Sequence, residues 1–373
     1  LIIKEGEIVA ISPVEGEAEE TLDLSDHLLM PGFVNAHCHL GLSALENKLS
    51  PAKTFANWIG DLIPLNAALN DEERIRAIGI GADEMKASGV TGLADYVADP
   101  ALLDSIFDLG FRSVLFLETI GFQEEKAEAV AAEVEAILKN HESNCNIGIA
   151  PHAPYSVSAK LWQRLDQLAK KYGCLLSTHL AETDEEIQFI EKGRGPLVDL
   201  LKDRQVFDMN WRVPGMTPAR YLKSMNVLSG TVAVHCNFID YDMDTVQAAV
   251  FCPKSTRWFR RTHILPVRKM LDAGIRVALG TDSLASNDSL NFLEEIRMAD
   301  KLLPDVSRKE ILMMATRFGG EVLHLPCGKM ETGQKADIIG FRIAAQGEDW
   351  YDLPFDPQCQ NVDFYMANGK IRA

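Results

Sequence analysis

From Pro31 onward, short apolar runs of strand length alternate along the chain with segments of helical periodicity. Eight runs can be recognised, at residues 33–36, 90–95, 112–117, 146–151, 174–179, 231–235, 249–252 and 275–280. Buried strands that alternate with helices form parallel sheets, and eight strands close a (β/α)8 barrel. An open, doubly wound sheet is the rival fold, but no glycine-rich phosphate turn follows any early strand. We therefore expect an α/β fold with a TIM-like barrel.

The segments between these runs carry helix signals. Helical periodicity covers residues 71–89, 124–141 and 158–173, and Ser158 is a suitable N-cap for the last of these. Several predicted helices end at a glycine, the residue favoured just beyond a helix C-terminus. One crossover is unusually short, because only about sixteen residues separate His235 from Cys252, near the lower limit for such a connection. Either its helix is very short or a few residues are missing there.

The two ends of the chain do not follow this alternation. Residues 1–30 and 325–373 have the character of strands, with turn signals such as "KEGEI" and "MANGKI". We expect them to pair into one composite β-sandwich domain beside the barrel. The barrel itself would then occupy residues 31–324.

The charge balance and the cysteines limit the partners and the compartment. The formal net charge is −17 at pH 7, so no nucleic acid polymer is expected as a partner, because phosphate binding needs a cationic face. No apolar stretch is long enough to span a bilayer, and the first residues predict strand–turn–strand and not a signal peptide. The seven cysteines lack CxxC spacing, which argues against a disulfide framework and for the cytoplasm. Apolar helix faces could support a homodimer.

Histidine and aspartate gather where the predicted strands end. Side chains alternate along a strand, so residues i and i+2 point to the same side. In "PGFVNAHCHL" these two residues are His37 and His39. In a barrel, active sites lie at the face where the carboxyl ends of the strands meet. The residues at these ends are His37, His39, His152, His179, His235 and Asp282. Five of the nine histidines are among them, so we predict that they converge on one site.

The residue types at these ends indicate a metal. Imidazole nitrogens with one carboxylate suit zinc, with ferrous iron as the alternative. We assign His37, His39, His179 and Asp282 as ligands of one divalent ion per chain, with water at the remaining position. The ion would lower the pKa of this water towards 7 and so supply hydroxide. A second ion is not expected, because the run at 146–151 contains no lysine that could be modified into a bridging group.

Two further residues are predicted to be catalytic. Glu182 lies three residues after His179 and could take the proton of the water and deliver it to the leaving group. Alternatively, Glu182 could be an acid at a helix N-terminus, where the helix dipole favours negative charge. The acids at 184–186 suit that role better. His235 could be a fifth ligand, or it could hold the attacking water and polarise the developing oxyanion. We favour the second role because four protein ligands are already assigned.

Together these motifs resemble the amidohydrolase superfamily, in its deaminase/chlorohydrolase branch with a single metal. The motifs that carry the resemblance are "PGFVNAHCHL", "APHAPYS", "THLAET", "VHC", "CPKS" and "GTDSLASNDSLN". The chain is similar to S-adenosylhomocysteine/methylthioadenosine deaminases, aminodeoxyfutalosine deaminases and triazine hydrolases. The resemblance implies the same metal ligands and the same roles for Glu182 and His235. It also implies that His152 contacts the substrate and that Trp58, in "TFANWIGDLIP", covers it.

The chain departs from the family pattern in "CPKSTRWFRR". Thr256 stands there in place of the family's asparagine. No arginine matches the one that holds a substrate carboxylate in homocysteine-type members. Arg257, Arg260 and Arg261 could substitute for it, or they could be solvated charges.

We therefore expect a mononuclear zinc-dependent aminohydrolase that acts on a small heterocyclic substrate. It would deaminate an aminated purine-type nucleoside or a related heterocycle, aminodeoxyfutalosine- or adenosine-like, and release ammonia. One alternative is hydrolytic dechlorination or deamination of a triazine-like ring, which needs the same hydroxide. Another is a non-catalytic barrel that binds a metal or a ligand. Glu182 argues against this last alternative, because a binding site needs no proton shuttle.

Overall fold

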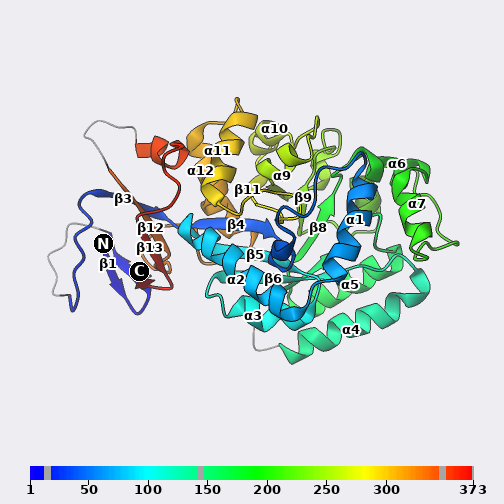
Figure 1. Cartoon of the computed structure of the whole chain (residues 1–373), viewed down its shortest axis with the longest axis horizontal. Coiled ribbons are helices and arrows are strands. Elements are labelled where there is room, and N and C mark those ends of the chain that lie inside the picture. Colours follow the sequence, from blue (N-terminus) through cyan, green and yellow to red (C-terminus); the bar gives the residue numbers. More distant parts are fainter. Residues whose placement is uncertain (12–17, 142–145, 344–349, 372–373) are drawn as a thin grey trace.

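The computed structural model describes residues 1–11, 18–141, 146–343 and 350–371. Eight parallel strands form the central sheet (Figure 1), and each is hydrogen-bonded to the next in chain order. They are β4 (Phe33–Cys38), β5 (Val90–Val97), β6 (Arg112–Thr119), β7 (Ile147–Pro151), β8 (Leu176–Leu180), β9 (Thr231–His235), β10 (Ala248–Phe251) and β11 (Arg276–Leu279). All eight predicted runs form strands, and the predicted eight-stranded parallel sheet is confirmed.

The first and last strands of this sheet, β4 and β11, come together at their carboxyl ends. Cys38 and Asp282 form a parallel bridge, and the backbone N–H groups of Thr281 and Asp282 both donate to the carbonyl of His37, at 3.0 and 3.1 Å. Glycine at position 280 permits this approach, since a Cβ there would lie 2.8 Å from the Cβ of His37. The closure of the barrel therefore places Asp282 beside the first strand.

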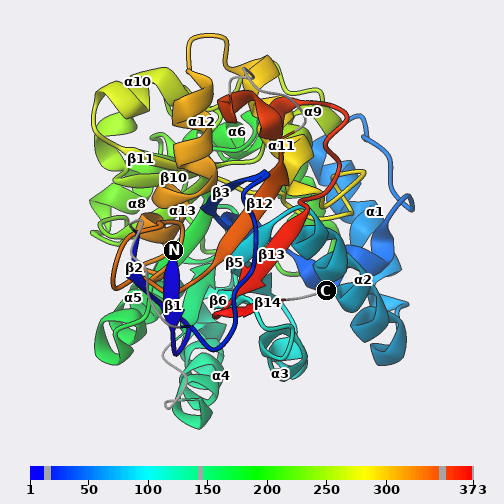
Figure 2. The same ribbon diagram turned by 90° about the vertical axis from the view of Figure 1, so that its left-hand side faces the viewer.

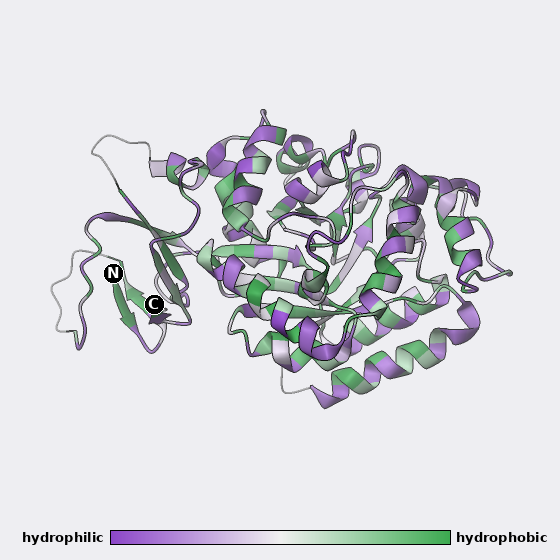
Figure 3. Ribbon diagram, in the orientation of Figure 1, coloured by the Kyte–Doolittle hydropathy of each residue, from purple (hydrophilic) through white to green (hydrophobic). Residues whose placement is uncertain are grey.

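Helices surround the sheet, and they carry both hydrophilic and hydrophobic bands (Figure 3). Ser158 caps one of them, α5, by accepting the N–H of Leu161 at 3.3 Å, and Gly173 ends it with a φ of +66°. The helices are α1 (Phe55–Ala67), α2 (Asp71–Ala87), α3 (Leu103–Phe107), α4 (Ala127–Asn140), α5 (Ala159–Tyr172), α6 (Asp184–Lys192), α7 (Pro196–Asp203), α8 (Pro218–Ser224), α9 (Pro253–Trp258), α10 (Val267–Asp272), α11 (Phe292–Leu302), α12 (Arg308–Ala315) and α13 (Arg317–Val322). The three predicted helices correspond to α2, α4 and α5.

The short crossover between His235 and Cys252 has a simple form. Its helix is reduced to one 3-10 turn, η4 (Met243–Thr245), so the chain reaches β10 without a crossover α-helix. The other 3-10 turns are η1 (Leu40–Leu45), η2 (Pro100–Leu102), η3 (Glu124–Lys126) and η5 (Trp350–Phe355). None of the described helices is long and apolar enough to cross a membrane.

Both ends of the chain form antiparallel sheets beside the barrel (Figures 1 and 2). A hairpin of β1 (Ile2–Lys4) and β2 (Glu7–Ala10) lies against a four-stranded sheet in the order β14 (Lys370–Ile371), β13 (Phe364–Ala367), β12 (Ile338–Arg342) and β3 (His27–Pro31). The backbones of Glu7 and Lys335 form an antiparallel β-bridge. The buried residues Ile8, Ile338 and Met366 form an apolar core between the sheets. The predicted β-sandwich from both termini is confirmed.

Candidate active site

Strand ends bring the predicted histidines together. His37 lies near the end of β4, and His39 begins the turn that follows this strand. His179 lies on β8. One ring nitrogen from each of the three lies within 4.8 Å of the others. His39 Nε2 and His179 Nε2 are 3.4 Å apart, which matches two nitrogens bound to one tetrahedral ion with bonds of about 2.1 Å. The three imidazoles can therefore hold a single divalent ion.

Asp282 supplies a carboxylate to the same cluster. Its Oδ1 lies 3.9 Å from His37 Nε2 and 4.0 Å from His39 Nε2. Ser255 Oγ donates to Oδ2 at 2.6 Å, and the backbone N–H of Ser283 donates to Oδ1 at 2.9 Å. These two hydrogen bonds orient the carboxylate, and Oδ1 faces the imidazoles.

His37 shows most directly that this cluster fits a metal. Its side chain is fully buried, and neither ring nitrogen has a hydrogen-bond partner among the described residues. An unpaired buried polar group costs free energy, and a bound cation would remove that cost at Nε2. Three imidazole nitrogens and one carboxylate oxygen form a donor set suited to zinc or ferrous iron.

Burial keeps these imidazoles neutral, which is the form that binds a metal. Burial first, and then the neighbouring histidines, hold the pKa of His37 well below its usual range. Burial lowers the pKa of His39 and that of His179 to about 3. For His179 the neighbouring His39 and His235 act in the same direction, because two imidazolium charges repel each other.

The ring of His179 is also oriented from its far side. Its Nδ1 pairs with the backbone carbonyl of His152 at 2.9 Å, so Nδ1 carries the proton and Nε2 is free to face His39. The side chain of His152 lies beside it, with ring centroids 4.9 Å apart, and its Nδ1 contacts Ser156 Oγ at 2.6 Å. The sequence predicts a role for the His152 side chain only, because no pattern in it indicates which backbone carbonyl meets His179.

Glu182 lies next to the histidine cluster, immediately before Thr183, the N-cap of α6. Its Oε2 is 4.0 Å from His235 Nε2, and burial lowers the pKa of His235 to about 4. The backbone N–H groups of Ala181 and Glu182 both donate to the Glu186 carboxylate at 3.0 Å. Glu186 thus fixes the turn that presents Glu182, a structural role beyond that of an acid near a helix dipole.

Trp58 lies on α1, a helix within the segment after the first barrel strand. Its ring stacks on Phe55 with centroids 5.5 Å apart, and its Nε1 donates to the carbonyl of Ala285 at 3.2 Å. Glu185 anchors the start of this helix by accepting the N–H groups of Phe55 and Ala56, at 2.6 and 3.0 Å. Trp58 therefore has a defined position in the wall of the site.

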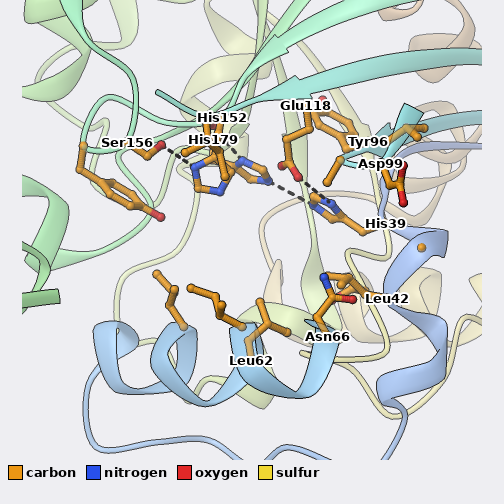
Figure 4. A pocket seen from close by; sticks show the side chains of 18 of the residues that line it. His39, Leu42, Leu62, Asn66, Tyr96, Asp99, Glu118, His152, Ser156 and His179 are labelled. Carbon is orange, nitrogen blue, oxygen red and sulfur yellow. Dashed lines mark hydrogen bonds and ion pairs between the residues drawn. The ribbon is translucent and has the colours of Figure 1, made fainter. Parts of the chain in front are cut away.

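A cavity of about 700 Å³ is lined by most of the predicted site residues. His39, His152, His179 and Glu118 lie on one side of it, and the α1 side chains Leu62 and Asn66 face them from the opposite side (Figure 4). Away from the polar cluster, the cavity is lined by apolar side chains that come from α1 and from the region of α7. The predicted site residues that line the cavity are His39, Trp58, His152, His179, Glu182, His235 and Asp282. His37 is fully buried and is not part of this lining.

Two buried acids near the cluster have no role that the sequence predicts. Asp95, on β5, accepts the backbone N–H of Leu40 at 2.7 Å, and its Oδ1 is 3.1 Å from Cys38 Sγ. Glu118, on β6, has Oε2 at 3.9 Å from His39 Nδ1, while its Oε1 has no partner among the described residues. Burial raises the pKa of Glu118 to about 8, and the nearby Asp95 and Asp282 add to this. An acid at the end of an apolar strand run was the available signal for both.

The chain is similar to known proteins in sequence and in fold. The sequence profile of the amidohydrolase family matches residues 28–372. A 5-methylthioadenosine/S-adenosylhomocysteine deaminase from Caldanaerobacter subterraneus subsp. tengcongensis is 30% identical over 383 residues, covering 95% of this chain and 83% of that protein.

Two solved structures have the same architecture. Helicobacter pylori aminofutalosine deaminase, in complex with methylthio-coformycin, is 25% identical, with a TM-score of 0.80 over 93% of this chain and 87% of that chain. An atrazine chlorohydrolase mutant from Arthrobacter aurescens, complexed with zinc and atraton, is 21% identical, with a TM-score of 0.83 over 99% of this chain and 89% of that chain. At that identity the second likeness shows the fold alone.

Proposed function

The chain belongs to the amidohydrolase family, and on that premise we propose that it is a mononuclear zinc-dependent aminohydrolase. Its substrate would be an aminated purine-type nucleoside or a related heterocycle, aminodeoxyfutalosine- or adenosine-like, and its products would include ammonia. The observation that carries this proposal is that the buried Glu182 lines the same cavity as His39 and His179, two members of the His37–His39–His179 cluster. The deaminases among its relatives support the same reaction class.

Four residues would hold the metal: His37, His39, His179 and Asp282. Zinc fits this set of three imidazole nitrogens and one carboxylate oxygen. When bound, such an ion supplies Lewis acidity that lowers the pKa of a coordinated water. Ser255 and the His152 carbonyl keep Asp282 and His179 in ligand orientation.

Glu182 would move the protons of the reaction. Its carboxylate accepts a proton from the attacking water and passes it to a ring nitrogen of the substrate, so that the ring carbon becomes electrophilic. It then carries the second water proton to the amine, which leaves as ammonia while the ring carbon keeps the oxygen. His235, beside Glu182 Oε2, would stabilise the negative charge that develops on this oxygen.

The cavity is compatible with a nucleoside-sized ligand. Its volume of about 700 Å³ lies within the range of small-molecule sites. The reacting ring would lie at the polar end, near His152 and Trp58, which we propose as substrate contacts. The apolar lining from α1 and α7 would then cover the remainder of the substrate.

An ammonia-release assay tests this function. The metal-replete protein is supplied with adenosine, 5′-methylthioadenosine, S-adenosylhomocysteine and aminodeoxyfutalosine, and with atrazine in a separate arm that measures chloride. We expect ammonia release from at least one nucleoside and none from protein treated with a chelator. Silence on every nucleoside would overturn the proposal, and chloride release alone would assign the triazine chemistry.

A further inference from the structure

Arg261 differs from the two other arginines of the "CPKSTRWFRR" segment. Arg257 and Arg260 are exposed, whereas the side chain of Arg261 is only 15% exposed. Its guanidinium carbon lies 4.5 Å from the centroid of the Phe259 ring and 5.1 Å from that of Phe55. An arginine packed against aromatic rings is held in one orientation.

The Arg261 guanidinium is directed at Glu182. Its Nη2 donates to Glu182 Oε1 at 2.7 Å, and the Glu182 side chain is only 7% exposed. A charge-assisted hydrogen bond at this depth is stronger than one in water. The other carboxylate oxygen, Oε2, is the one that faces His235. The two oxygens of Glu182 therefore have different environments.

We propose that Arg261 is a positioning residue that holds Glu182 in its proton-transfer orientation, an inference that rests on the function proposed for Glu182. The terminal torsion of a glutamate is soft and roughly two-fold, so an unrestrained carboxylate would sample several orientations. Arginine occupies Oε1 as a donor that does not lose its proton. The mobile proton is thereby confined to Oε2, the oxygen on the side of His235.

This assignment changes the expected substrate contacts. Nη2 of Arg261 is committed to Glu182, while its buried Nε has no hydrogen-bond partner among the described residues. If Arg261 acts through Glu182, its loss should lower the rate of the chemical step and leave substrate affinity unchanged. If instead it bound the substrate, its loss would appear mainly in KM.

Steady-state kinetics of three variants separate these roles. We expect Arg261→Gln to lower kcat about 100-fold, the scale of a small misplacement of a catalytic group, with KM changed by less than about threefold and bound metal unchanged. Arg261→Lys should recover part of kcat because it retains a positive charge. The matched control is Arg257→Gln, which removes an exposed arginine of the same segment and should match the wild type.

A double-mutant cycle and a structure complete the test. If Arg261 acts through Glu182, then Arg261→Gln should cause no further loss in a Glu182→Gln background. Crystal structures of the metal-loaded proteins should show the Arg261–Glu182 contact in the wild type and a displaced Glu182 carboxylate in Arg261→Gln.

The inference is overturned by independent losses in the cycle, by a rise in KM at constant kcat, or by an unmoved carboxylate. A wild-type protein inactive on every nucleoside would instead refute the proposed function, and the crystal structures would still decide whether Arg261 orients Glu182.

Discussion

Asp95 on β5 holds both neighbours of His39 in place: its Oδ1 accepts the N–H of Leu40 at 2.7 Å and lies 3.1 Å from the thiol sulfur of Cys38. The residues before and after a proposed metal ligand are thus fixed by one buried carboxyl group on the adjacent strand. Pre-orientation of a ligand increases metal affinity, because less conformational freedom is lost on binding.

Removal of Asp95 should therefore weaken metal binding. We expect Asp95→Ala to lower zinc affinity about 10- to 100-fold, measured by competition with a chromogenic chelator. The control is Asp108→Ala, which removes an exposed aspartate after α3. Equal affinities for the Asp95 variant and the wild type would refute this role.

Neutralising Glu182 should stop proton transfer while the metal remains bound. Glu182→Gln keeps the size of the side chain, and we expect kcat to fall about 10²- to 10⁴-fold with metal content unchanged, as measured by elemental analysis. Asp184→Asn, an exposed acid two residues later, should retain wild-type kcat. Full activity of the Glu182 variant would contradict the proton-transfer role of this acid.

Trp58 should contribute to substrate binding through the apolar area that it covers. Removal of a buried aromatic contact of this kind costs about 1.5–3 kcal/mol, so Trp58→Ala should raise KM by roughly one to two orders of magnitude. Trp350→Ala is the matched control, because that tryptophan is 54% exposed and does not line the cavity. A KM unaffected by the Trp58 change would remove this residue from the substrate site.

Glu310 should make stability depend on pH at the acid end. Hydrogen bonds from Arg268 and Ser307 lower the pKa of Glu310 from the reference value of 4.5 to about 2. A lowered folded-state pKa gives a contribution that is complete above the reference pKa and disappears as pH falls through the folded value. Glu310→Gln should therefore lower the free energy of unfolding by about 1 kcal/mol at pH 7.

This deficit should shrink from about pH 4.5 downward and vanish near pH 2, as measured by urea unfolding at each pH. The control, Glu133→Gln, changes an exposed glutamate on α4 and should follow the wild type throughout. A deficit in the Glu310 variant that stays constant with pH would contradict the ion-pair explanation.

The sequence predicts the parts of this site that depend on the periodic pattern of side chains within single strands and helices. Alternation along a strand places His37 and His39 on one side, and the ends of parallel strands must meet at one face of a barrel. The eight strands and the terminal sandwich could be predicted for the same reason, since each depends on patterns within a few residues.

Contacts between distant segments could not be predicted in this way. The guanidinium of Arg261 turns inward after α9 and the left-handed residue Arg260, with φ of +55°, and no periodicity encodes that direction. The short helix α9 (Pro253–Trp258) gives no pattern that separates Arg261 from Arg257. The hydrogen bonds that Asp95 accepts from Cys38 and Leu40 likewise depend on the register between two strands.

The central claim is that one ion binds the four predicted ligands, and anomalous diffraction from crystals of the zinc-loaded protein tests it most directly. The account predicts one zinc peak per chain, about 2.0–2.2 Å from a nitrogen of His37, His39 and His179 and from an oxygen of Asp282. A principal peak bound instead by Glu118, His152 and His179, the second group of donor atoms in the cavity, would contradict it, as would a zinc-loaded crystal with no ion at these residues.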